Sequence, residues 1–201
     1  MFTGIIEALG VVETINAQGT SLTFRLSCPF ARQLRPEESL SHDGVCLTVT
    51  RQDAHGYSVT AVEETLRRTR LGEWATGSQI NLERSMPASG RFDGHMVQGH
   101  VDTTATVAHI DDRDGSWVFT FDIDPAWSHL LVDKGSACIN GVSLTVFNCL
   151  ATSFQVTLIP YTWQHTNLSA LQAGAKVNIE FDIMAKYLYK WHRPQEITNV
   201  L

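Results

Sequence analysis

The chain contains an internal repeat, which constrains the fold more than any other feature of the sequence. Six residues, Gly44-Val45-Cys46-Leu47-Thr48-Val49, recur from residue 141, an offset of 97, as Gly141-Val142-Ser143-Leu144-Thr145-Val146. The same offset carries further residues onto identical ones: Thr65 onto Thr162, Thr69 onto Thr166, Leu71 onto Leu168, Gly77 onto Gly174, Asn81 onto Asn178 and Glu83 onto Glu180. Near the chain start, Gly4-Ile5 matches Gly99-His100 at an offset of 95. Two copies of one unit predict two similar domains.

Each copy has the pattern of several short strands with few helices. In the first copy, strands are predicted at residues 10–15, 21–27, 45–50, 57–62 and 78–82, and short helical turns at 30–34 and 64–69. Many short strands in so few residues favour a closed barrel, because closure removes exposed sheet edges. We therefore predict an all-β fold of two similar six-stranded barrels, at residues 1–88 and 95–181. The turn-forming segment 85–91 is the predicted linker.

The segment after the second copy has no counterpart in the first. Asp182 can cap a helix whose apolar residues share one stripe, namely Ile183, Met184, Tyr187, Leu188 and Trp191. We predict a helix over residues 183–193, ended by Pro194. The stripe either packs on its own chain or associates with other chains, and the pattern favours neither.

Composition excludes some classes of function. The 201 residues carry a formal net charge of -6 and lack the large basic patch that binding nucleic acid requires. No leader-like or long apolar segment is present, so we expect a cytoplasmic protein with a small-molecule ligand. Four cysteines, none in a Cys-x-x-Cys pair, are expected to be free thiols: Cys28, Cys46, Cys138 and Cys149.

The repeated strand has one apolar and one polar face. Alternation places Val45, Leu47 and Val49 on one face and Cys46, Thr48 and Thr50 on the other, and the second copy places Ser143 and Thr145 on its polar face. Tight-turn pairs, Asp43-Gly44 and Asn140-Gly141, fix where each face begins. The polar faces could be plain outer surface, but their duplication favours two related polar clefts.

Histidines cluster where the second copy begins. The segment from residue 93 to 102 holds His95, His100 and two aspartates, a set that a metal hydrolase could use, although its spacing matches no strong zinc motif. His100 stands at the copy position of Ile5. Because it is polar and unique to one copy, we expect it to distinguish the roles of two similar ligands. The sequence lacks glycine-rich nucleotide-binding motifs, so we expect no cofactor and no metal.

Five blocks together are similar to the riboflavin synthase family over the whole chain: residues 1–7, 43–49, 64–69, 94–102 and 140–146. The resemblance implies antiparallel barrels of Greek-key type and one lumazine per barrel. It also implies a homotrimer held by the C-terminal helix, with each active site between the first barrel of one subunit and the second barrel of a neighbour. Lumazine synthase is a further candidate partner.

The resemblance also implies which residues surround each ligand. One set is Phe2, Thr3, Gly4, Cys46, Thr48, Val62, Glu64 and Thr65; the other is Gly99, His100, Lys134, Ser143, Thr145, Ile159, Thr162 and Asp182. This chain departs from the family pattern by exchanging the types at Asp43 and Asn140. Both types shape the same turn, so the departure affects only a specific role for a carboxylate at residue 140.

The implied reaction is a dismutation. Two molecules of 6,7-dimethyl-8-ribityllumazine give riboflavin and 5-amino-6-ribitylamino-uracil by transfer of a four-carbon unit. The acidic 7-methyl group of the lumazine needs a base or nucleophile, for which His100 is the first candidate, with Ser143 and Cys46 as polar or nucleophilic assistants. Which of them attacks carbon is open. The alternative function is a non-catalytic lumazine- or flavin-binding carrier with the same duplicated barrel.

Overall fold

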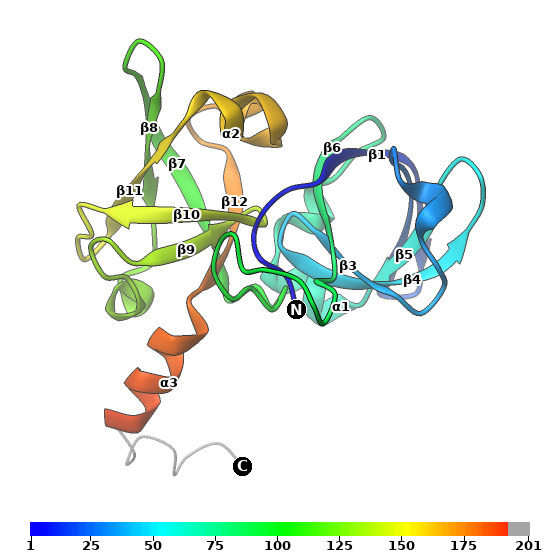
Figure 1. The fold of residues 1–201 in the computed structure, drawn as a ribbon, viewed down its shortest axis with the longest axis horizontal. Helices are drawn as coiled ribbons and strands as arrows, with labels where there is room; N and C mark the ends of the chain where they lie inside the picture. The colour runs from blue at the N-terminus through cyan, green and yellow to red at the C-terminus, as the bar shows by residue number, and fades with distance from the viewer. Residues whose placement is uncertain (193–201) are drawn as a thin grey trace.

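The computed structural model describes residues 1–192 and contains two closed antiparallel six-stranded barrels side by side, with a helix projecting from the second (Figure 1). The first barrel has the strand order β1-β2-β5-β4-β3-β6, and the second has the same cyclic order, β10-β11-β8-β7-β12-β9. Because β2 pairs with β5 and β1 with β6, the connections are of Greek-key type. The predicted fold class is confirmed.

The strand bounds follow the repeat. The first barrel consists of β1 (Ala8–Gln18), β2 (Ser21–Ser27), β3 (Ser39–His42), β4 (Val45–Gln52), β5 (Tyr57–Ala61) and β6 (Gln79–Arg84). The second consists of β7 (Thr103–Asp112), β8 (Trp117–Asp122), β9 (Ser136–Ile139), β10 (Val142–Phe147), β11 (Ser153–Leu158) and β12 (Lys176–Phe181).

Short helices close each barrel at matching positions. They are α1 (Glu63–Arg68) and α2 (Pro160–His165), with the 3-10 helices η1 (Ala31–Gln33), η2 (Arg70–Glu73), η3 (Pro125–Leu130) and η4 (Asn167–Ala170). Helical turns were predicted at residues 30–34 and 64–69, and both are present with shifted bounds. Val62, predicted to end a strand, instead caps α1 in extended backbone.

Alternation fills both cores as predicted. Val45, Leu47 and Val49 are buried inside the first barrel, whereas Thr48 and Thr50 are exposed on its outer face. The strand β10 repeats this arrangement, with Val142, Leu144 and Val146 in the second core. The polar face of each repeated strand is therefore free to build a site.

The two barrels meet at their repeated turns, where polar side chains bond across a pseudo-twofold axis. Asn81 Nδ2 donates to the carbonyl oxygen of Asn140 (2.9 Å), and Asn178 Nδ2 donates to that of Asp43 (2.9 Å). The backbone NH groups of the same two asparagines donate to Asp43 Oδ1 and Asn140 Oδ1. Since Asp and Asn use the same acceptor oxygen here, the Asp43/Asn140 exchange leaves the interface intact.

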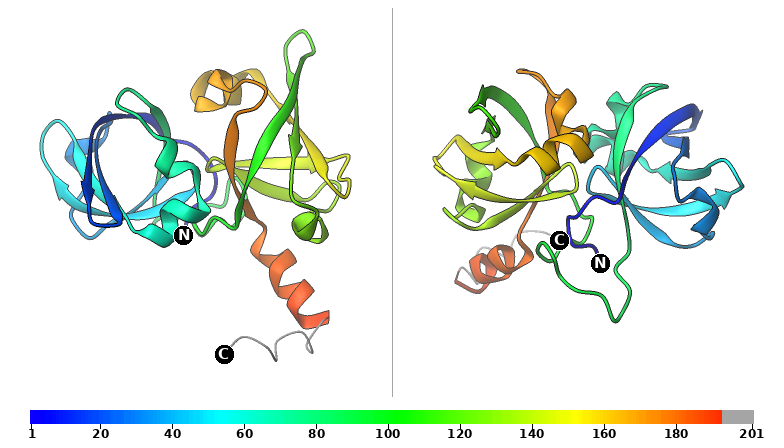
Figure 2. Two further views of the ribbon diagram at one scale, coloured as in Figure 1. Left: turned by 180° about the vertical axis from the view of Figure 1, so that it is seen from behind. Right: turned by 45° about the horizontal axis from the view of Figure 1, so that its top comes forward.

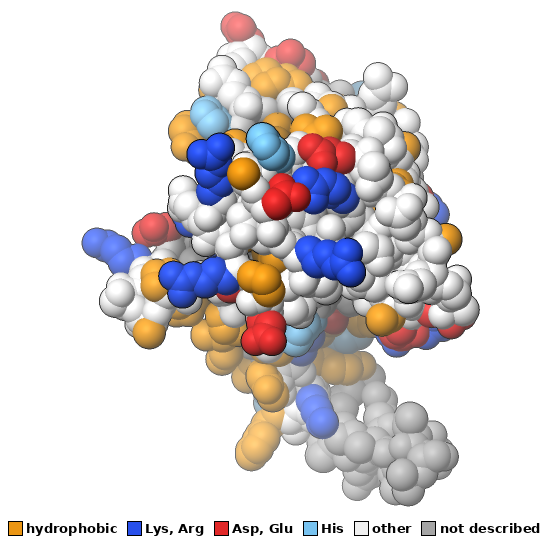
Figure 3. Space-filling view, turned by 90° about the vertical axis from the view of Figure 1, so that its right-hand side faces the viewer, with side chains coloured by type: hydrophobic (Ala, Val, Ile, Leu, Met, Phe, Trp, Pro, Cys, Tyr) orange, Lys and Arg blue, Asp and Glu red, His pale blue; other side chains and the backbone are white. Residues whose placement is uncertain are grey.

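The last helix, α3 (Ile183–His192), projects away from the barrels (Figure 2). Ala185 and Tyr189 pack against the second core, and Lys186 forms a 2.6 Å ion pair with Asp102. Four large apolar side chains are more than half exposed: Met184, Tyr187, Leu188 and Trp191. Figure 3 shows hydrophobic side chains gathered where α3 leaves the barrels. Residue 193 and Pro194 lie outside the described residues. Among the described residues, no helix is long and apolar enough to cross a membrane.

Candidate active site

Each barrel places a strap of backbone against the repeated strand of the other barrel. The N-terminal strap (residues 2–4) lies on β10, where Ser143 N donates to the Gly4 carbonyl (2.8 Å). The second strap (residues 97–100) lies on β4, where Cys46 N donates to the Gly99 carbonyl (2.8 Å). The two straps also pair with each other through Phe2 and Val97.

Only glycine fits at the centre of each strap. Gly4 and Gly99 have φ of 78° and 82°, in the left-handed region. A Cβ on Gly4 would lie 2.6 Å from the Cβ of Ser143, and one on Gly99 would lie 2.5 Å from the Cβ of Cys46. The repeated glycines therefore let each strap approach the residue that distinguishes the two copies.

The first-barrel site is a small cavity of about 180 Å³. Candidates from β4, α1 and the second strap line it together: Cys46, Glu64, Thr65, Gly99 and His100. Arg68 also lines it and forms an ion pair with Glu64, whose carboxylate accepts from Arg67 as well. These two guanidinium groups lower the pKa of the Glu64 carboxyl. The site thus combines a thiol, an imidazole and a paired carboxylate.

The second-barrel site contains a close histidine–serine contact. His95 Nδ1 lies 2.6 Å from Ser143 Oγ, and His95 Nε2 is buried without a hydrogen-bond partner among residues 1–192. Burial lowers the pKa of His95, and the nearby Asp182 carboxylate opposes this shift. The neutral ring that burial favours has one unprotonated nitrogen. When this nitrogen is Nδ1, it accepts the hydrogen bond of the Ser143 hydroxyl and can act as its base.

The helices α1 and α2 differ at matching positions. Where the first barrel has the Glu64–Arg68 ion pair, the second has Tyr161 and His165, whose rings stack with centroids 4.1 Å apart. Both pairs occupy positions one helical turn apart. A charged contact in one copy is thus replaced by an aromatic one in the other.

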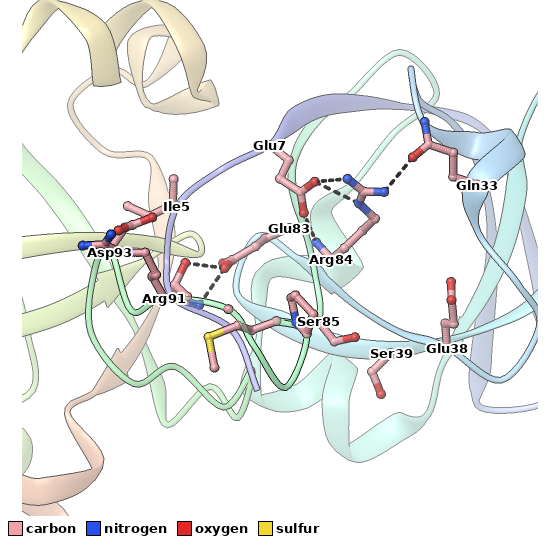
Figure 4. Close-up of a pocket in the computed structure, with 14 residues that line it drawn as sticks. Ile5, Glu7, Gln33, Glu38, Ser39, Glu83, Arg84, Ser85, Arg91 and Asp93 are labelled. Atoms are coloured by element: carbon pink, nitrogen blue, oxygen red, sulfur yellow. Dashed lines mark hydrogen bonds and ion pairs between the residues drawn. The ribbon is translucent and has the colours of Figure 1, made fainter.

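A larger cavity of about 560 Å³ lies beside the N-terminal strap (Figure 4). Its polar wall includes Glu7 and Arg84, which form an ion pair at 2.6 Å, while Arg84 also donates to Gln33 (2.8 Å). Of the predicted site residues, only Thr3 lines this cavity. Because its lining shares so few residues with the predicted sites, the cavity is a less convincing ligand site than the two strap sites.

In the structure, residues that the family resemblance assigned to different ligands lie together. Gly99 and His100, grouped with Ser143, lie beside Cys46, and Thr3 and Gly4, grouped with Cys46, belong to the strap on Ser143. The physical reason is that each strap reaches across to the other barrel. Phe2 is fully buried and packs with Val97, Cys138 and Cys46 between the barrels.

The remaining candidates lie around these centres. Thr48 and Thr145 are exposed on the polar strand faces, and Val62 and Ile159 are exposed at the starts of α1 and α2. Lys134 is exposed in left-handed backbone before β9, and Asp182 accepts a hydrogen bond from Met184 N at the start of α3. Thr65 and Thr162 accept the same 2.7 Å hydrogen bonds from Thr69 and Thr166.

His95 is the candidate site residue that sequence reasoning missed. It was considered only as half of a metal pair with His100, but the two histidines belong to the sites of different barrels. Among residues 1–192, no group of three His, Cys, Asp or Glu side chains could hold a metal ion. The segment 93–102 drew attention to His95, but its contact Ser143 lies 48 residues away, so no local pattern links the two side chains.

Comparison with known proteins defines the class to which this fold and these sites belong. The sequence model of the lumazine binding domain matches twice, at residues 3–85 and 98–182. The crystal structure of LumP complexed with riboflavin has a TM-score of 0.83 and 22% identity, over 90% of this chain and 99% of that one. This likeness supports the shared fold.

Curated relatives narrow the class. Riboflavin synthase of Bacillus subtilis is 38% identical over 98% of this chain and 92% of its own length. Riboflavin synthase of Actinobacillus pleuropneumoniae is 39% identical over 94% of this chain and 88% of its own length. The corresponding protein of Saccharomyces cerevisiae is 34% identical over 94% of this chain. The chain belongs to the riboflavin synthase family.

Proposed function

We propose that the chain converts two molecules of 6,7-dimethyl-8-ribityllumazine into riboflavin and 5-amino-6-ribitylamino-uracil. The observation that carries the proposal is a duplicated strap site with unequal chemistry, Cys46 with His100 in one copy and Ser143 with His95 in the other. Equal scaffolds suit two identical substrates, and unequal side chains suit the different roles of a donor and an acceptor of carbon. The family relatives point to the same transferase reaction.

The chemistry asks for proton transfer and alignment. The Ser143 hydroxyl, with His95 as its base, is suited to attack or proton transfer at one lumazine, and His100 is suited to move the proton of the acidic 7-methyl group at the other. The four-carbon transfer redistributes atoms between two identical molecules, so it consumes no oxidant or reductant. Holding the two rings together supplies the largest rate factor, worth up to about 10 kcal/mol.

We assign the surrounding residues by the crossed geometry. One lumazine is held by Cys46, Thr48, Val62, Glu64 and Thr65, with Gly99 and His100 from the second strap. The other is held by Thr3, Gly4, Lys134, Ser143, Thr145, Ile159, Thr162 and Asp182. Phe2 supports the N-terminal strap from within its packed cluster. We propose barrel domains at residues 1–88 and 95–181, followed by the oligomerisation helix predicted over 183–193, of which residues 183–192 are described as α3.

The exposed face of α3 supports an assembly. One side of the helix packs on its own barrel, while Tyr187, Leu188 and Trp191 are 55–82% exposed. We propose a homotrimer in which this face is buried and the first-barrel site of one subunit meets the second-barrel site of its neighbour. A cytoplasmic location fits the four free cysteines. Association with lumazine synthase is a further expectation, tested by co-purification.

A turnover assay tests the reaction directly. Purified protein is given 6,7-dimethyl-8-ribityllumazine alone, with a chelator present, and riboflavin is measured by its fluorescence. We expect riboflavin to form. Binding of the lumazine without turnover would favour the carrier function, and turnover that requires an added metal ion would favour metal chemistry.

A further inference from the structure

Two carboxylates, Glu83 on β6 and Glu180 on β12, are buried at the same position of the two barrels. Their exposed fractions are 4% and 2%. Glu83 accepts from Thr3 N (2.6 Å), Thr3 Oγ1 (2.7 Å) and Gly4 N (2.9 Å). Glu180 accepts from the backbone NH groups of three successive residues, Gln98 (2.7 Å), Gly99 (2.9 Å) and His100 (2.9 Å). Each carboxylate therefore holds one strap.

A carboxylate suits this role better than a neutral side chain. Three donors converge on each carboxylate, and its two oxygens are strong acceptors. Burial raises the pKa of both Glu83 and Glu180, while the strap hydrogen bonds oppose that shift. Lys186, the cation that acts on Glu180, is itself paired with Asp102. The straps are thus the direct partners that compensate the buried charges.

Each carboxylate and the site it serves are on different barrels. The strap held by Glu83 of the first barrel lies on Ser143 of the second barrel. The strap held by Glu180 of the second barrel lies on Cys46 of the first barrel, and it brings His100 into the Cys46 cavity. Figure 4 shows Glu83 pointing at the N-terminal strap.

We propose that Glu83 and Glu180 are positioning residues that build the two sites crosswise, Glu83 for the Ser143 site and Glu180 for the Cys46 site. The consequence for turnover rests on the proposed function. The crossed arrangement itself rests on the geometry alone. The duplicated enzyme would then need both barrels to complete either site.

Thiol labelling tests the crossing without substrate. In E180Q, the amide group turns one acceptor into a donor and loosens the second strap over Cys46. We expect iodoacetamide to alkylate Cys46 about tenfold faster or more, because hydrogen bonds to a charged group limit local opening. E83Q should leave the Cys46 rate within about twofold, as peptide mass spectrometry would measure.

The S143C variant supplies the reciprocal measurement. In this background E83Q should accelerate labelling of the introduced thiol, and E180Q should not, while Cys46 in the same molecule behaves in the opposite way. Equal acceleration of both thiols by each substitution would mean general loosening and would overturn the proposal. So would acceleration only of the thiol in the substituted barrel. Thermal unfolding of each variant identifies a preparation that has lost its fold, and the measurement is then repeated with E83D or E180D.

Turnover of the same preparations completes the test. We expect E83Q and E180Q each to lower kcat by about tenfold or more, because a loosened strap misplaces reacting groups. Crossed labelling with unchanged kcat would overturn the positioning role. If the unsubstituted chain makes no riboflavin, the proposed function fails, while labelling still decides whether the carboxylates act crosswise.

Discussion

The two barrels share a scaffold but differ in the side chains that line their sites. The scaffold residues repeat without change: the strap glycines, the interface asparagines Asn81 and Asn178, and the carboxylates Glu83 and Glu180. The site residues do not repeat, since Cys46 becomes Ser143 and Ile5 becomes His100. In a duplicated chain, identity between copies thus marks what holds the site, and difference marks where the two sites can act differently.

In the proposed trimer, deleting residues 183–201 would have the largest effect, because it would separate the two kinds of site that meet between subunits. The exposed apolar side chains of α3 would each contribute about 1.5–3 kcal/mol when buried between subunits. We expect two folded barrels, monomers in place of trimers and a turnover lower by about a thousandfold or more, because proximity is lost. Sedimentation and a riboflavin assay measure both effects.

The matched variant L188E changes only the exposed face of the helix. It should reproduce the monomer and the loss of turnover, while binding of the lumazine to each barrel survives better than catalysis. A monomer with undiminished turnover would show that the site does not lie between subunits.

Substitutions at the unequal residues sharpen the comparison. We expect S143A and H100A to lower kcat by about a hundredfold or more, as loss of a proton-transferring group does. H95A should match S143A, because the two side chains are in direct contact at 2.6 Å. C46A and I5A, the copy-related controls, should cost much less. Steady-state kinetics on the five folded variants would contradict the unequal roles if all losses were equal.

Most of the fold follows from the sequence because the repeat and the alternation are local patterns. The strand β3 was not located, since Ser39-Leu40-Ser41-His42 is short and has no β-branched or aromatic residue to favour a strand. Closure of the barrel supplies that strand through pairing with β4 and β6. Local propensity therefore locates the strands with strong patterns, whereas closure of the barrel adds the strand that local propensity does not predict.

The site was predicted less completely, because its assembly depends on contacts between distant residues. The repeat identifies Cys46, Ser143 and His100 as unequal positions, but no local pattern tells that Gly99 lies on Cys46 rather than on Ser143. The His95–Ser143 contact spans 48 residues and is set by the strap. The interface turns decide which barrel a strap reaches. These turns come together only when the two barrels pack, so the sequence pattern does not show it.

Two titratable residues of the first copy have neutral counterparts in the second. Burial lowers the pKa of His42 to about 4, and its copy position is Ile139. Burial raises the pKa of Asp43 to about 6 against the opposing charge of Arg70, and its copy position is Asn140. His42 stabilises the fold above its unfolded pKa and loses this contribution as pH falls towards 4. Asp43 acts in the opposite direction. Because its folded pKa is raised, it favours folding as the pH falls from 6 towards its pKa in the unfolded chain.

These opposed linkages make the first copy testable by pH. With D43N, the free energy of unfolding should fall between pH 6.5 and 4 by about 3 kcal/mol relative to the unsubstituted chain, because His42 is then uncompensated. With H42I, it should rise over the same range relative to the unsubstituted chain. Denaturant unfolding at several pH values measures the differences. Parallel pH profiles for all three proteins would show that neither group titrates between the folded and unfolded states as stated.

The smallest effect is expected where the two barrels are most alike. Thr69 Oγ1 donates to the Thr65 carbonyl and accepts from Leu71 N, and Thr166 Oγ1 makes the same pair of hydrogen bonds with Thr162 and Leu168. Each hydroxyl joins a short helix to the 3-10 turn that follows it. T69A and T166A should therefore each lower the free energy of unfolding by about 1 kcal/mol.

The equality of these two losses is the sharper part of the prediction. Thr166 is 4% exposed and Thr69 is more exposed, so unequal losses would show that burial, rather than the shared hydrogen bonds, sets the contribution of this position. Denaturant unfolding of both single variants and of the double variant measures this, and losses that add in the double variant would indicate that the two barrels respond independently. Equal, additive losses would confirm that the copies differ in chemistry and not in scaffold.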